Sequence, residues 1–116
     1  MLLLDHLVSV PPEAWTFVER MGMRTEFKAI LEYTQEYYSP VEEIVVEFDP
    51  CDPTMETEAV VIHVAVTPGT PFGMEADADW MRILGERYPR EFLIHVTPHS
   101  YLRPEEPEWR GLHGRT

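Results

Sequence analysis

Large apolar residues alternate with polar or small ones in three segments of the chain, at residues 41–48, 59–67 and 91–97. Alternation with a period of two and many β-branched side chains are typical of strands that have one buried face. One side of each predicted strand carries the larger apolar residues, which are Ile44, Val46, Phe48, Val60, Ile62, Val64, Val66, Phe92, Ile94 and Val96. We expect this side to face the core.

Two other segments, residues 12–38 and 75–88, place apolar residues three and four positions apart. This spacing predicts amphipathic helices. Gly22 divides the first segment, which therefore predicts two helices or one kinked helix. The second segment has acidic residues in its first turns, as the helix dipole favours, and Pro89 ends it.

The resulting order, α-α-β-β-α-β, predicts an α+β domain in which helices cover one face of a small, mostly antiparallel three-stranded sheet. If the first two strands form a hairpin, strand 41–48 lies between the other two, or strand 91–97 lies beside strand 59–67. We favour the first, a split βαβ-like sandwich, because it makes every neighbouring pair antiparallel. Residues 1–98 then form one domain, and the proline-rich, charged residues 99–116 predict an extended or disordered tail.

The chain has 116 residues and is 44% hydrophobic, which suits one domain with its own core. Cys51 is the only cysteine, which excludes a disulfide framework and favours the reducing cytoplasm. Asp5 and His6 interrupt the leucine-rich start of the chain, so residues 2–10 predict a short helix or an edge element. They lack the apolar stretch of about seven residues that a signal peptide needs.

The formal net charge is −12, from 21 acidic and nine basic residues. Nucleic acids and anionic membranes are bound by neutralising their negative charge with cations, so both partners are disfavoured. A negative field of this size suits a basic protein partner, a cationic ligand or simple solubility.

The other side of the predicted sheet brings together residues that could carry chemistry. It collects Glu43 and Glu47 from one strand, His63 from the second and His95 from the third. Two imidazoles and two carboxylates could bind a divalent metal such as zinc, or could transfer protons. The local spacing of a metal motif is missing, and no cofactor is otherwise indicated.

Two further interpretations of this side remain open: a plain solvated surface, and an interface in a homo-oligomer or with a protein partner. Val45, Val61 and Leu93 would be the apolar part of that interface. In the tail, Trp109 is a candidate anchor, because tryptophan is common where a flexible arm docks on a partner.

No catalytic motif is recognisable, so the sequence leaves enzymatic activity undecided and leans against it. The acidic charge, the mixed sheet face and the aromatic tail favour a non-catalytic interaction module that is regulatory, inhibitor-like or self-assembling. The alternative is a small metal-binding protein or enzyme that uses the glutamate and histidine cluster.

Overall fold

The structure is a computed structural model that describes residues 8–52 and 57–102. Its elements follow in chain order as β1 (Val8–Ser9), α1 (Pro12–Arg20), α2 (Arg24–Tyr37), β2 (Val41–Asp52), β3 (Thr57–Val66), α3 (Met74–Gly85), α4 (Arg90–Leu93) and β4 (Val96–Leu102). The predicted α+β class is confirmed. None of the described helices combines the length and the apolar composition needed to cross a membrane.

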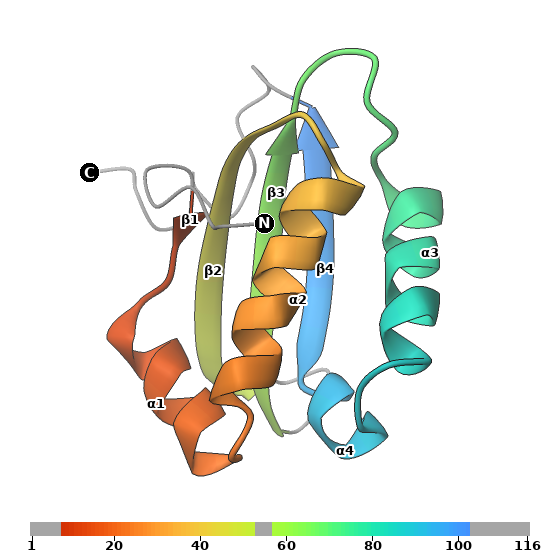
Figure 1. Cartoon of the computed structure of the whole chain (residues 1–116). Coiled ribbons are helices and arrows are strands. Elements are labelled where there is room, and N and C mark those ends of the chain that lie inside the picture. Colours follow the sequence, from red (N-terminus) through yellow and green to blue (C-terminus); the bar gives the residue numbers. More distant parts are fainter. Residues whose placement is uncertain (1–7, 53–56, 103–116) are drawn as a thin grey trace, which may run out of the picture.

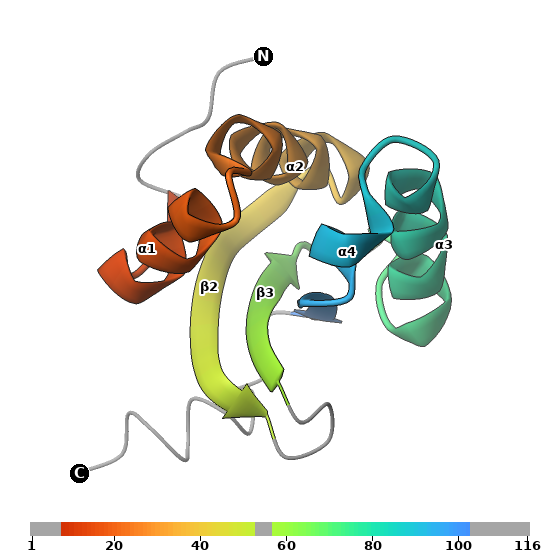
Figure 2. The same cartoon turned by 90° about the horizontal axis from the view of Figure 1, so that it is seen from below.

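The described strands form a four-stranded sheet in the order β1-β2-β3-β4 (Figure 1). Strands β2 and β3 are antiparallel, whereas β1 lies parallel to β2 and β4 lies parallel to β3. The helices lie together on one side of the sheet (Figure 2). The described chain therefore has two layers, one of helices and one of strands.

The two helices expected over residues 12–38 are both present as α1 and α2. Gly22 separates them with a φ of 70°, a conformation that residues with a Cβ rarely adopt. The edge element expected near the start of the chain is also present, because Val8 and Ser9 pair with Ile44 and Val45 of β2.

The predicted three-stranded, mostly antiparallel sheet is wrong in strand number, strand order and strand direction, because two of the three described pairs are parallel. Strand 41–48 does not lie in the middle; β3 lies between β2 and β4. The preference for antiparallel neighbours failed because the segment from β3 to β4 contains α3. A helical crossover of this length allows two neighbouring strands to run parallel.

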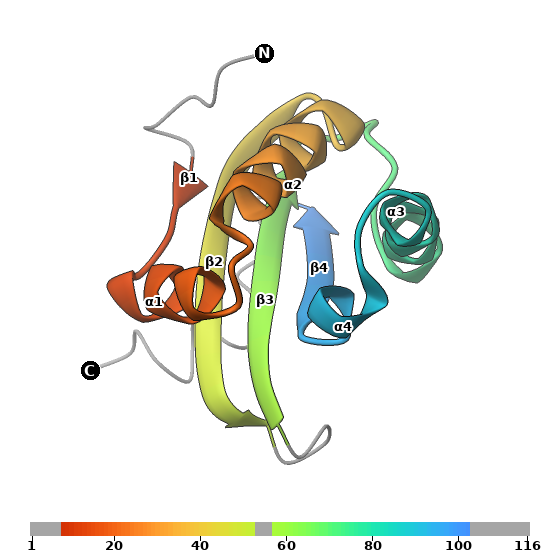
Figure 3. The same ribbon diagram turned by 60° about the horizontal axis from the view of Figure 1, so that its bottom comes forward.

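The last strand was also predicted too early in the sequence. Residues 90–93 form the short helix α4, and the strand runs from Val96 to Leu102 (Figure 3). Pro98 suggested that the strand ends there, but β4 is an edge strand of the described sheet. A proline is tolerated on an edge, where its missing N–H would point away from the neighbouring strand.

This shift changes the surroundings of two apolar residues. Ile94 was expected in the core, but it follows α4 and its exposed fraction is 50%. Leu93 was expected on the side away from the helices, but it lies in α4 and is buried in the core cluster. The sheet continues to Leu102, beyond the boundary expected at residue 98, and residues 103–116 lie outside the described chain.

The core lies between the helices and the sheet, as the alternation predicted. Ile44, Ile62 and Val64 point from the sheet into a cluster that also contains buried side chains from the helices. The largest fully buried side chains of the described residues include Trp80 from α3, Phe17 from α1 and Phe27 from α2. Burial of these faces fixes which side of the sheet points away from the helices.

Candidate functional site

We call the sheet side opposite the helices the histidine face. The register of β2, β3 and β4 places alternate residues on it. Its described residues are Glu43, Val45, Glu47, Asp49, Ala59, Val61, His63, Ala65, Thr97, His99 and Tyr101. Glu43, Glu47 and Asp49 follow one another along β2, and we call them the carboxylate row.

A continuous polar contact crosses the histidine face from β2 to β4. Glu47 Oε1 lies 3.0 Å from His63 Nε2, and His63 Nδ1 lies 2.9 Å from His99 Nδ1. His63 and His99 are direct neighbours in the parallel register of β3 and β4. The His99 ring also stacks on Tyr101, with ring centroids 5.6 Å apart.

Chemistry assigns the protons in this contact. A carboxylate only accepts, so Glu47 receives the Nε2–H of His63. If His63 is neutral, its Nδ1 atom accepts the Nδ1–H of His99, and if His63 is protonated, its Nδ1–H donates to His99. His63 has an exposed fraction of only 4%, so both of its ring nitrogens need partners. The arrangement can hold a fixed tautomer and can pass a proton between strands.

The predicted metal set is only partly assembled. Glu47 contacts His63, but Glu43 lies four residues away along β2, about 13 Å in an extended strand. Among the described residues, no group of three or more histidine, cysteine, aspartate or glutamate side chains could hold a metal ion.

His95, the fourth predicted ligand, lies elsewhere. It comes just after α4, where the chain is not yet in the strand, and its ring packs on Phe17 with centroids 5.2 Å apart. Its Nδ1 atom lies 2.8 Å from the backbone oxygen of Glu58. His99 takes the place that the sequence assigned to His95. The signal was present in the alternation of Thr97, His99 and Tyr101, but Pro98 obscured it.

The predicted interface residues are divided between two places. Val45 and Val61 are half-buried on the histidine face. Leu93 lines an apolar depression of about 300 Å³ between α3 and α4, together with Met81, Gly85, Arg90 and Ile94. Trp109 lies outside the described residues.

A second polar cluster joins α2, α3 and β4 on the helical side. The Asp77 carboxylate accepts bonds from the Tyr38 hydroxyl at 2.6 Å, the Ser100 hydroxyl at 2.6 Å and the Ser100 N–H at 3.2 Å. Ser100 Oγ in turn accepts the Gly73 N–H at 2.7 Å. Burial, followed by the bond to Asp77, raises the pKa of Tyr38 far above its ordinary value. These groups satisfy one another, which indicates a structural role.

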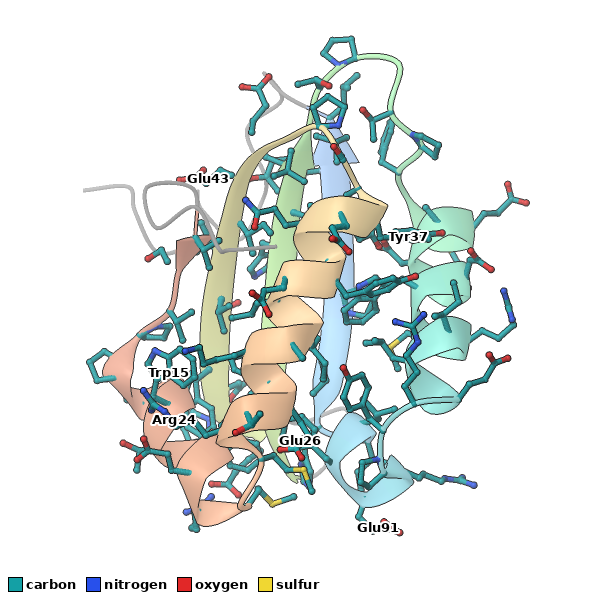
Figure 4. The ribbon with its side chains drawn as sticks, viewed as in Figure 1. Trp15, Arg24, Glu26, Tyr37, Glu43 and Glu91 are labelled. Carbon is teal, nitrogen blue, oxygen red and sulfur yellow. The ribbon has the colours of Figure 1, made fainter. Side chains whose placement is uncertain are left out.

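Tyr37 makes a similar connection nearer the surface and extends from α2 to α3 (Figure 4). Its hydroxyl donates to Asp79 Oδ2 at 2.8 Å. Burial and this bond raise the pKa of Tyr37 to about 12. Arg82, and then Tyr37, lower the pKa of Asp79.

The same cluster occupies the middle of the outer edge of β4. The backbone N–H and C=O groups of the odd-numbered residues in β4 point toward β3, as the bond from Val60 N–H to His95 O requires. The backbone groups of Pro98 and Ser100 therefore point outward. Pro98 has no N–H, and the N–H of Ser100 is held by Asp77. These two positions therefore offer no N–H for pairing with another strand.

Comparison of the chain with family models, curated proteins and solved structures gives no match. Function must therefore be inferred from the geometry of the chain. The polar groups around Asp77 satisfy one another within the fold, so the histidine face is the stronger candidate for a functional site.

Proposed function

We propose that this chain is a non-catalytic interaction module that binds a basic protein partner through the histidine face. The observation that carries the proposal is the one-sided packing of the fold. All described helices lie against the opposite side of the sheet (Figure 2). The histidine face combines the half-buried Val45 and Val61 with the carboxylate row.

The chemistry of this face matches that of a protein interface. Apolar side chains surrounded by charged ones supply buried contact at the centre and electrostatic complementarity around it. The net charge of −12 adds a long-range field that attracts cations and speeds their association.

Val61→Lys is expected to weaken partner binding by about tenfold, which corresponds to about 1.4 kcal/mol. The substitution removes an apolar contact at the centre of the face and adds a charge that repels a basic partner. Val61 lies opposite Glu47 and Thr97, so the new lysine has a carboxylate neighbour and the fold should persist. The measurement is quantitative capture of the partner from an extract of the natural source, with wild-type and variant compared.

Ala78→Lys is the matched control, because it adds the same charge at an exposed position of α3. It should capture as much partner as the wild-type chain. Captured protein should also be basic and should dissociate as salt is raised, since salt screens charge contacts. Equal capture by Val61→Lys and wild-type would contradict the proposal. Native mass spectrometry of the wild-type chain would show whether the partner is a second copy.

A second candidate function is suggested by the contact between Glu47, His63 and His99. A histidine that binds a metal commonly donates its other ring N–H to a carboxylate, as His63 does to Glu47. His63 and His99 would supply two nitrogen ligands for a divalent ion such as zinc. The remaining ligands would be water or groups outside this pair.

If this site binds zinc, replacing both His63 and His99 with alanine is expected to weaken the binding at least about tenfold. His95→Ala is the matched control, because His95 lies off the histidine face and should leave affinity unchanged. Isothermal titration with zinc, combined with native mass spectrometry of untagged protein, measures both effects. A wild-type chain that neither carries nor takes up a metal would rule out this second function.

A further inference from the structure

We propose that the C-terminal segment of the chain, residues 103–116, docks on the histidine face of the same molecule. The contact would pair the basic end of the segment with the carboxylate row and would place Trp109 against Val45 and Val61. The histidine face is then an occupied surface in the isolated protein.

Several side chains of the histidine face are buried. Ala65, His63 and Tyr101 have exposed fractions of 0%, 4% and 9%. The described helices cannot cover these side chains, because they lie on the other side of the sheet (Figure 2). Val45 and Val61 on the same face are only half-buried. They are the apolar surface that Trp109 would cover in the docked arrangement.

The described chain ends at Leu102, beside the histidine face. Leu102 pairs with Val66, and the preceding pair, Tyr101 with Ala65, extends across to Glu43 of β2. The segment therefore begins at the end of the face where Glu43 lies, near the start of β2 (Figure 4). Seven residues span up to about 24 Å when extended, which is enough to bring Trp109 beside Glu47.

The charge and composition of residues 109–116 complement the histidine face. Residues 103–108 contain three glutamates, but residues 109–116 contain Arg110, His113 and Arg115 and no acidic residue. Arginine pairs well with carboxylates, and a tryptophan beside an arginine is a common anchor at interfaces. The segment thus carries the same combination of apolar and basic groups that the histidine face favours.

This arrangement has a consequence for regulation, which rests on the proposed function. A basic partner would compete with the chain's own segment for the carboxylate row. Only molecules with an undocked segment would then bind the partner, so the apparent Kd would equal the intrinsic Kd divided by the undocked fraction.

The test is a paramagnetic spin label on the full-length chain. The label is attached at position 113 by His113→Cys in a chain that also carries Cys51→Ser. Amide signals of Val45, Val61 and Thr97 should lose intensity, whereas those of exposed α3 residues such as Arg82 should not. Adding Arg110→Glu and Arg115→Glu should restore the signals, because the charge pairing is lost. The paired control, Arg87→Glu with Arg90→Glu, should leave the loss of intensity unchanged.

Two outcomes would overturn the proposal. One is a loss of intensity confined to the helical side, or spread evenly along the chain. The other is seen when spin-labelled protein without ¹⁵N is mixed with unlabelled ¹⁵N protein. Loss at Val61 in that mixture, equal to the loss within one molecule, would show that the occupant is a second copy. The experiment uses no partner, so its failure is distinguishable from failure of the proposed function.

Discussion

Replacing Trp80 with alanine is expected to lower the free energy of unfolding by about 3–5 kcal/mol. Trp80 is fully buried and belongs to the core cluster beneath α3. Its Nε1–H donates to Thr34 Oγ1 at 3.0 Å, and that hydroxyl donates to Ile30 O at 2.6 Å. Alanine leaves a large cavity and removes one of the hydrogen bonds that join α3 to α2.

The measurement is urea unfolding followed by circular dichroism. Met74→Ala is the control on the same helix, because the Met74 side chain is 89% exposed and its loss should change stability by less than about 0.5 kcal/mol. An unchanged urea midpoint for Trp80→Ala would contradict the burial of Trp80 in the core.

Replacing Asp77 with alanine is expected to lower the free energy of unfolding by about 2–4 kcal/mol. The carboxylate accepts bonds from the Tyr38 hydroxyl and from both the hydroxyl and the N–H of Ser100. Tyr38 is fully buried and Ser100 is 5% exposed, so neither regains full contact with water. The loss of stability comes mainly from the Tyr38 hydroxyl and the polar groups of Ser100, which lose their hydrogen-bond acceptor.

Asp79→Ala is the matched control, because Asp79 follows Asp77 by less than one turn of α3. Asp79 pairs with Arg82 at the surface, where ion pairs contribute about 1 kcal/mol or less. The Tyr37 hydroxyl, which loses Asp79, still has Ala76 O at 3.2 Å. Urea midpoints of the two variants decide the question, and equal midpoints would refute the central role of Asp77.

Both residues influence the histidine face indirectly. Trp80 holds α3 against α2, and Asp77 holds α3 against Ser100 of β4. Ser100 follows His99 directly, so the bonds of Asp77 help to fix the strand that places His99 beside His63. Asp77→Ala should therefore be made separately from the variants that test binding on the histidine face.

Local sequence signals were sufficient where one residue type decides the local conformation. The alternation in β2 and β3 gave the two strands and their buried sides, because a residue's side of the sheet depends only on its position in the strand. Gly22 indicated the break between α1 and α2, because glycine adopts a positive φ without the help of any tertiary contact. The placement of Glu43, Glu47, Val61 and His63 on one face followed from the same alternation.

The last strand could not be placed in this way. Phe92, Leu93 and Ile94 are apolar in succession, and a short apolar run can belong to a strand or to a turn of helix. Whether residues 92–94 form a strand or a turn of helix depends on where the chain that leaves α3 begins to pair with β3. Pro98 is compatible with β4 only because β4 lies at the edge of the described sheet, which is a property of the sheet and not of the local sequence.

The sequence by itself determined the α+β class, the buried sides of β2 and β3, and the acidic net charge. Only the tertiary structure decided that β4 pairs with β3, that His99 rather than His95 meets His63, and that Leu93 packs with the helices. The physical reason is that alternation fixes the side of a strand on which a residue lies. The neighbour of that strand is set by long-range packing, which local patterns do not encode.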